Sequence, residues 1–244
     1  MNPWWAGLRA QLSQRVSPGM RQHVRRLRRP AWPALLRRSR PVSAVWGFDR
    51  GTPVDRYFIE RFLAEHRTDV QGNVLEVRDD GYTRRFGSDL RQVDILDIDP
   101  RNHRATIVAD LTRADSLTAD RFDCFILTQT LQFIFDVRTA VAHACRMLRP
   151  RGVLLATVPA LSRLSPRYGL TAEYWRFTPA ACTELFGAVF GPEQVQVHSY
   201  GSLVTATAFL MGLASEELRG PQLSFHDPYF PVLIAVRAVK RAAE

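Results

Sequence analysis

The chain has few cysteines, a single lysine and no long apolar run. Its three cysteines are widely spaced and form no Cys-x-x-Cys pair, which excludes a disulfide framework and favours core thiols in a reducing compartment: Cys124, Cys145 and Cys182. No stretch reaches the roughly 18 apolar residues of a membrane-spanning helix. Arginines also interrupt the N-terminal segment where a signal peptide would have its apolar core. We therefore expect a cytoplasmic protein.

Acidic residues are absent from the first 48 positions, which hold ten arginines. Residues 49–244 hold 23 basic and 24 acidic residues, so the formal charge of +9 belongs to the N-terminal segment. This balance argues against a nucleic-acid surface across the whole protein. We predict an Arg-rich extension at 1–45 and one domain at 46–244. The extension is either a solvated tail or a contact for an anionic membrane surface or a partner protein, and the oligomeric state stays open.

Alternating apolar runs and amphipathic segments predict the fold. Short apolar runs closed by turn residues are typical of buried strands, and they lie at 74–77, 93–99, 105–110, 122–128, 153–158, 195–200 and 232–239. Helical patterns lie between them at 53–65, 136–148, 178–190 and 203–218. This alternation predicts an α/β fold with a doubly wound, seven-stranded, mostly parallel sheet in a single domain.

Two of the predicted strands end in acidic residues. Glu76 and Asp79 lie at the end of the first strand, and Asp99 closes the second. In open α/β sheets the ligand lies outside the carboxyl ends of the strands, and an acid that ends the second strand commonly binds the hydroxyl pair of a ribose. The sequence therefore predicts a nucleoside site with Asp99 on its ribose.

Several motifs follow one another in the order found in class I S-adenosylmethionine-dependent methyltransferases, which the chain resembles over about residues 46–240. They are VLEV at 74–77, Asp99, Ala109-Asp110-Leu111, Phe122-Asp123, LRPRGVLL at 148–155 and YWRFT at 174–178. Three further motifs resemble a bacterial subgroup that accompanies glycosyltransferases: RGTPVDRY at 50–57, GYTRRFG at 81–87 and DPYFPV at 227–232. The resemblance implies S-adenosylmethionine as cofactor and O-methylation of a sugar hydroxyl on a glycan or a glycosylated metabolite.

The first turn departs from the family pattern, acid-x-Gly-x-Gly-x-Gly. Its glycine places hold Arg78, Asp80 and Tyr82, and Gly81 is out of step. In one interpretation the turn takes another path, in which the acids meet the amino group of the cofactor's methionine part and Arg78 or Arg84 meets its carboxylate. In the other, cofactor binding is lost and the protein is an interaction module. An RNA methyltransferase that uses the Arg-rich extension is a third hypothesis.

The resemblance assigns residues to a cofactor site. We expect cofactor contacts from Glu76, Arg78, Asp79, Gly81, Asp99, Asp110, Leu111, Thr128 and Gln129. Asp110 could instead cap a helix, and Thr128 and Gln129 could satisfy loop backbone groups.

A base for methylation of a hydroxyl should lie past the carboxyl ends of the strands. The candidates are Asp136 and the pair His226–Asp227, which could equally form a surface turn. Tyr174, Trp175 and Arg176 suit a sugar substrate, because aromatic faces stack on pyranose rings and Arg binds hydroxyls or phosphate. In the alternative, Trp175 and Phe177 anchor the loop into the core. No spacing of His, Cys or acidic residues indicates a metal.

Overall fold

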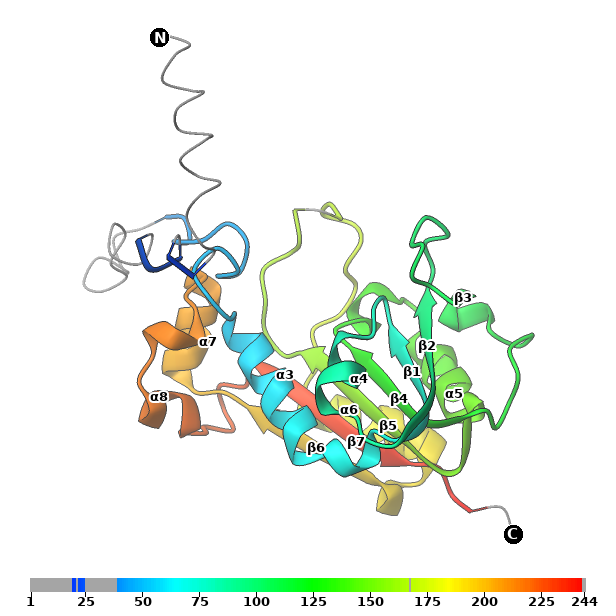
Figure 1. The fold of residues 1–244 in the computed structure, drawn as a ribbon. Coiled ribbons are helices and arrows are strands. Elements are labelled where there is room, and N and C mark those ends of the chain that lie inside the picture. The colour runs from blue at the N-terminus through cyan, green and yellow to red at the C-terminus, as the bar shows by residue number, and fades with distance from the viewer. Residues whose placement is uncertain (1–18, 21, 25–38, 167, 243–244) are drawn as a thin grey trace, which may run out of the picture.

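The computed structural model describes residues 19–20, 22–24, 39–166 and 168–242, so most of the Arg-rich extension lies outside the described residues (Figure 1). One sheet organises the described chain. Its strand order is β3-β2-β1-β4-β5-β7-β6. The strands are β1 (Gly72–Val77), β2 (Leu90–Asp97), β3 (Ile107–Val108), β4 (Phe122–Thr128), β5 (Leu148–Pro159), β6 (Val195–Tyr200) and β7 (Leu233–Val239).

The sheet is mostly parallel. Strands β1 to β5 pair in parallel, and only β7 runs antiparallel to its neighbours β5 and β6. Reversal of the strand order at β1 and β4 places the carboxyl ends of these two strands at a crevice, which is where doubly wound sheets bind ligands. The predicted seven-stranded, doubly wound α/β fold is confirmed.

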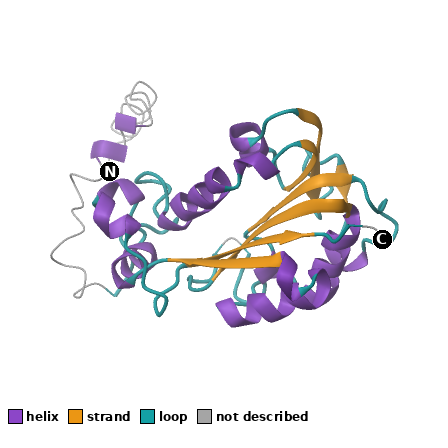
Figure 2. Cartoon of the chain, turned by 90° about the horizontal axis from the view of Figure 1, so that it is seen from below, coloured by secondary structure: helices purple, strands orange, loops and turns teal. Residues whose placement is uncertain are grey.

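Helices cover both faces of the sheet (Figure 2). The main ones are α3 (Val54–Glu65), α4 (Gly81–Phe86), α5 (Val137–Met147), α6 (Pro179–Phe190), α7 (Leu203–Met211) and α8 (Gly220–Ser224). Buried side chains of α3 and α7 pack on one face, whereas those of α5 and α6 pack on the other. Alternate residues of the central strands enter the two cores, for example Val74 and Leu75 on β1. The strands therefore read as continuous apolar runs because both of their faces are buried.

Several predicted boundaries are wrong. The strand expected over 105–110 is confined to Ile107–Val108, and the one expected over 153–158 extends over Leu148–Pro159. Strand β2 ends at Asp97, because Asp97 already accepts a turn hydrogen bond from the Asp99 amide (3.0 Å), so Asp99 lies in the following turn. The helix expected over 203–218 stops at Met211, because Gly212 adopts a left-handed φ of 72° and ends it. The short helices α4 and α8 lie in segments where no helix was expected.

The three cysteines are free thiols in apolar surroundings, as predicted. Cys124 and Cys182 are buried and Cys145 is half-buried. Burial raises the pKa of the Cys182 thiol to about 12, so this group stays protonated at neutral pH. Among the residues that the structure describes, no helix has both the length and the apolar character needed to span a membrane.

Candidate functional site

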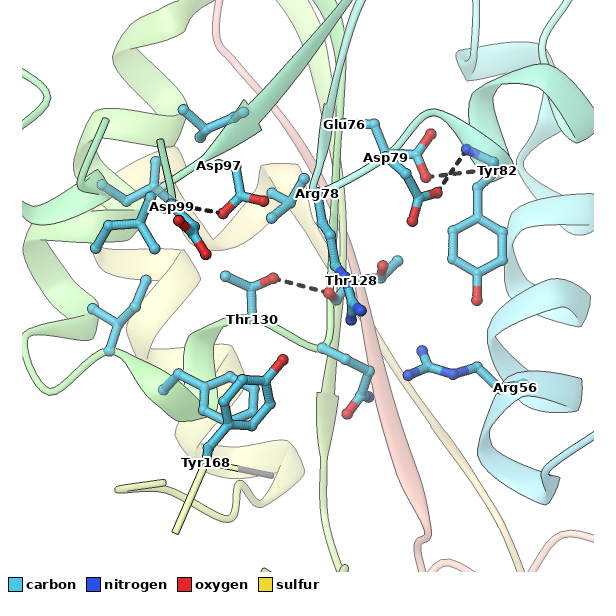
Figure 3. Close-up of a pocket in the computed structure, with 18 of the residues that line it drawn as sticks. Arg56, Glu76, Arg78, Asp79, Tyr82, Asp97, Asp99, Thr128, Thr130 and Tyr168 are labelled. Carbon is cyan, nitrogen blue, oxygen red and sulfur yellow. Dashed lines mark hydrogen bonds between the residues drawn. The ribbon is translucent and has the colours of Figure 1, made fainter. Parts of the chain in front are cut away.

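A cavity of about 960 Å³ opens at the carboxyl ends of β1, β2 and β4 (Figure 3). The structure brings all nine predicted cofactor contacts to its walls: Glu76, Arg78, Asp79, Gly81, Asp99, Asp110, Leu111, Thr128 and Gln129. Pockets for one small ligand measure about 300–1,000 Å³. The cavity therefore has room for a nucleoside cofactor and for part of a second molecule.

Glu76 is the penultimate residue of β1 and lies inside the protein, with 2% of its surface exposed. Its two carboxylate oxygens accept the backbone N–H groups of Tyr82 (3.1 Å) and Thr83 (2.7 Å) at the start of α4. Burial raises the pKa of Glu76 to about 7, although these hydrogen bonds lower it. Glu76 therefore both holds the turn after β1 and presents a carboxyl group that titrates near neutral pH.

Titration of Glu76 makes the stability of the protein depend on pH. Its pKa is raised in the folded state, so the fold binds the proton more tightly and stability falls as pH rises from about 4.5 to about 7. We expect the free energy of unfolding of the native protein to fall by about 2–3 kcal/mol between about pH 5 and pH 8, relative to Glu76→Gln. Urea titrations at both pH values measure this difference. If the free energy of unfolding changed equally with pH in the native protein and in Glu76→Gln, Glu76 would not be the group that titrates.

Arg78 occupies the first glycine place of the turn in a left-handed conformation, with a φ of 75°. Such a φ costs about 1–2 kcal/mol for a residue with a Cβ. Two hydrogen bonds to the backbone of Arg78 hold the turn: Arg78 N donates to the Leu96 carbonyl (2.8 Å), and the side-chain Nδ2 of Asn102 donates to the Arg78 carbonyl (2.8 Å). Its side chain extends across the cavity toward Thr128 (Figure 3). The glycine-poor turn thus leaves the cavity open and adds a cation to it.

Asp97 is a site residue that the sequence reasoning missed. It ends β2 and lines the cavity, and its second oxygen accepts a hydrogen bond from Asn102 Nδ2 (2.6 Å). Asp99 also lines the cavity, but its carboxylate is held by Arg101 through two hydrogen bonds of 2.9 and 2.8 Å. No local pattern in the sequence distinguishes Asp97 from Asp99, because acids alternate with apolar residues past the end of β2.

The next strands supply both polar and apolar walls. Asp110 caps the short helix that follows β3, with Oδ1 accepting from Thr112 N (2.8 Å), so the capping alternative holds while the residue also lines the cavity. Leu111 is buried beside it. At the end of β4, the Thr128 carbonyl accepts a hydrogen bond from Thr130 Oγ1 (3.0 Å). Gln129 has a left-handed φ of 48°, a strained conformation of the kind that clusters at functional sites.

Helix α3 and the segment before it form the opposite wall, whose residues the sequence reasoning did not assign to the site. Phe48, Thr52 and Arg56 line the cavity there, together with Tyr82 of α4. Tyr168 closes another side and packs edge-on against Phe133, with ring centroids 5.1 Å apart. Only packing between segments far apart in the chain makes this wall.

The three predicted bases lie outside the residues that line this cavity. Asp136 caps α5 by accepting from Thr139 N (3.1 Å) and Thr139 Oγ1 (2.7 Å). His226 lines a second, smaller pocket near Tyr200, and Asp227 caps a surface turn by accepting from Tyr229 N (3.0 Å). The structure does not bring these side chains to the main cavity. The described residues contain no cluster of three or more His, Cys, Asp or Glu side chains suited to a metal.

Tyr174, Trp175 and Arg176 fasten the long loop between β5 and α6. Trp175 Nε1 donates to the Ile134 carbonyl (2.9 Å), and Arg176 forms an ion pair with Glu173 (2.7 Å). Tyr174 also donates its backbone N–H to the Gln132 carbonyl (2.8 Å). None of the three lines the cavity, whereas Tyr168 and Ala172 of the same loop do. The anchoring alternative therefore describes the observed contacts.

Comparison with protein families matches residues 72–156 to the model described as Methyltransferase domain. A search of curated proteins gives no match. The 4+2 cyclase SpnF superposes with a TM-score of 0.53 at 14% identity, covering 80% of this chain and 84% of its own. A SAM-dependent methyltransferase from Archaeoglobus fulgidus superposes with a TM-score of 0.51 at 12% identity, covering 76% and 94%.

At such low identity the two structures show the fold alone. The family match indicates S-adenosylmethionine as the cofactor, and the chemistry of the lining fits it. Acids near the ends of β1 and β2 would suit a cationic amino acid group and ribose hydroxyls, and the apolar Ala109 and Leu111 would suit an adenine. The chain therefore has the α/β fold of the class I methyltransferases, and its residues 72–156 match the model described as Methyltransferase domain.

Proposed function

We propose that the protein is an S-adenosylmethionine-dependent methyltransferase that O-methylates a sugar hydroxyl of a glycan or a glycosylated metabolite. The observation that carries the cofactor assignment is the gathering of nine separately predicted contacts around one cavity. The acceptor class is supported by the motifs at 50–57, 81–87 and 227–232, and two of these motifs border the cavity.

The proposed roles follow from charge and position. Glu76 and Asp79 stabilise the cofactor's ammonium group, Arg78 binds its carboxylate, and Asp97 with Asp99 faces the ribose hydroxyls. When bound, the cofactor supplies an electrophilic methyl group on a sulfonium. Transfer is an in-line displacement, so alignment of the acceptor oxygen by the cavity walls contributes much of the rate, about 7–11 kcal/mol at most.

Isothermal titration calorimetry of the full chain tests the cofactor assignment. We expect S-adenosylhomocysteine and S-adenosylmethionine each to bind with one-to-one stoichiometry and micromolar dissociation constants, because the cavity offers acids to the ammonium group and to the ribose. Circular dichroism of the same sample controls for folding. Absence of heat with both ligands on folded protein would instead support an interaction module, in which Arg78 blocks the site.

A further inference from the structure

Two arginines enter the cavity without a carboxylate partner. Arg56 of α3 and Arg78 of the turn after β1 extend toward one another from opposite walls (Figure 3). Neither guanidinium forms an ion pair within 4 Å of a carboxylate among the described residues, whereas the nearby Arg85 pairs with Glu60 and Arg84 with Asp80. Acidic side chains line other parts of the cavity, but these two guanidinium groups make their own part of it locally positive, which favours an anionic group of a ligand there.

Arg56 is held in place for such a ligand. Its guanidinium carbon lies 5.9 Å from the centre of the Phe48 ring. Burial lowers the pKa of Arg56, but the nearby Asp55, the Tyr82 hydroxyl and Asp79 together raise it more, so the group stays charged. Asp55 Oδ1 is engaged with the backbone N–H of Arg56 (2.8 Å). Arg56 is therefore a fixed, charged donor whose side chain needs little further ordering to bind a carboxylate or a phosphate.

Gln129 adds an independent observation on the β4 side of the cavity. Its Nε2 atom is buried without a hydrogen-bond partner, while its carbonyl accepts from Gln132 Nε2 (3.0 Å) and its Oε1 faces the same group (3.4 Å). A buried donor without a partner has an energetic cost. A ligand oxygen that accepted this N–H group would remove the cost.

These observations divide the cavity into two subsites. The methionine part of the cofactor brings one carboxylate, and Arg78 lies in the same turn as Asp79, beside Glu76. Arg56 is then left for a second anion, with Phe48 next to it, 52% exposed and able to stack on a sugar ring.

We propose that Arg56, Phe48 and Gln129 form the acceptor subsite, and that the acceptor is a sugar carrying a carboxylate or a phosphate. This inference rests on the proposed function and names the substrate class of the same site. Arg56 binds the anionic group, Phe48 stacks on the ring, and Gln129 donates to an oxygen of the sugar.

Ligand-observed saturation-transfer NMR on the full chain, with and without saturating S-adenosylhomocysteine, tests the subsite. The probes are D-glucuronate, D-glucose 6-phosphate and neutral D-glucose at millimolar concentration. We expect at least one anionic sugar to bind about tenfold or more tightly than glucose, since charge-assisted bidentate hydrogen bonds are the stronger kind. The two anionic probes distinguish a carboxylate from a phosphate.

Arg56→Gln should remove the preference for the anionic sugar, and Arg56→Lys should restore part of it, while S-adenosylhomocysteine affinity changes less than about threefold. Arg61→Gln is the matched control, because Arg61 lies on the same helix outside the cavity and pairs with Glu65 (2.9 Å). Equal binding of all three sugars, no binding of either anionic sugar, or an unchanged preference in Arg56→Gln would overturn the proposal. A large loss of S-adenosylhomocysteine affinity in Arg56→Gln would also do so, by assigning Arg56 to the cofactor.

Failure of the proposed function gives a different result. If the native protein binds no cofactor but still prefers an anionic sugar in an Arg56-dependent way, the anion site stands and the methyltransferase assignment fails. If cofactor binds and the anion preference is absent, only the acceptor subsite fails.

Discussion

Replacing Asp97 with alanine is expected to weaken S-adenosylhomocysteine binding about 100-fold. Asp97 ends β2, lines the cavity and has a side chain that is only half-exposed. A hydrogen bond to a charged group contributes about 1.5–3 kcal/mol. We expect the partial loss of two such bonds to the ribose hydroxyls to cost about 3 kcal/mol, which is roughly 100-fold in affinity. Calorimetric titration of the native protein and the variant measures the ratio.

Asp99→Ala is the matched control and also tests the sequence-based assignment. Its carboxylate is 41% exposed and bound by Arg101, which lowers its pKa to about 2. Because a solvent-screened, already paired carboxylate gains little from a further partner, we expect a loss of less than about tenfold. If S-adenosylhomocysteine affinity fell more in Asp99→Ala than in Asp97→Ala, Asp99 would be the residue that binds the ribose, as the sequence predicted.

The sheet could be predicted because its central strands are buried on both faces. A strand in that position is a short apolar run, which locates β4 to the residue. The edge strand β6 instead alternates between half-buried and exposed residues over most of its length, and it was also located to the residue. The start of α6 was also predicted correctly. Thr178 accepts a hydrogen bond from Ala181 N (3.1 Å), and Pro179 occupies the first turn. These features depend on residues close together in the chain.

The end of β2 could not be predicted from such local sequence patterns. Residues 93–99 alternate between apolar and acidic side chains past the point where pairing stops. The stop depends on β3, which pairs only with Leu96 and Asp97, and on Asn102, which ties Asp97 to the turn after β1. A boundary set by contacts between separate segments leaves no local pattern.

The position of the His226–Asp227 pair shows the same limit. The pair precedes β7, so it lies near the predicted edge of the sheet, because an antiparallel strand begins where parallel strands end. Its distance from the main cavity is decided by strand order, which puts β7 next to β6 and the pair beside Tyr200. Arg56 is the converse case, a site residue that the sequence did not indicate. An arginine on a predicted helix is expected to face solvent, and only the position of the helix over the cavity shows otherwise.

Arg50→Ala is expected to lower the free energy of unfolding by about 3–5 kcal/mol, which is the cost of leaving one member of a buried ion pair without its partner. Arg50 is 1% exposed and forms a two-pronged ion pair with Glu217, with Nε 2.8 Å from Oε2. Glu217 also accepts the Ala214 N–H (3.0 Å), so its carboxylate stays buried in the variant. Urea denaturation monitored by circular dichroism measures the loss.

Arg241→Ala is the matched control, because it removes an arginine from an exposed ion pair and so separates the effect of burial from the loss of the pair itself. Arg241 pairs with Glu193, and both side chains are more than half exposed, so its removal should cost less than about 1 kcal/mol. The double variant Arg50→Met/Glu217→Leu should recover most of the stability, because replacing both members removes the unpaired charge. The pair also fixes the segment that leads to Thr52 in the cavity wall, so S-adenosylhomocysteine affinity should fall in Arg50→Ala but not in Arg241→Ala. Equal losses of stability in the two single variants would show that the Arg50–Glu217 pair is solvated and does not brace the wall.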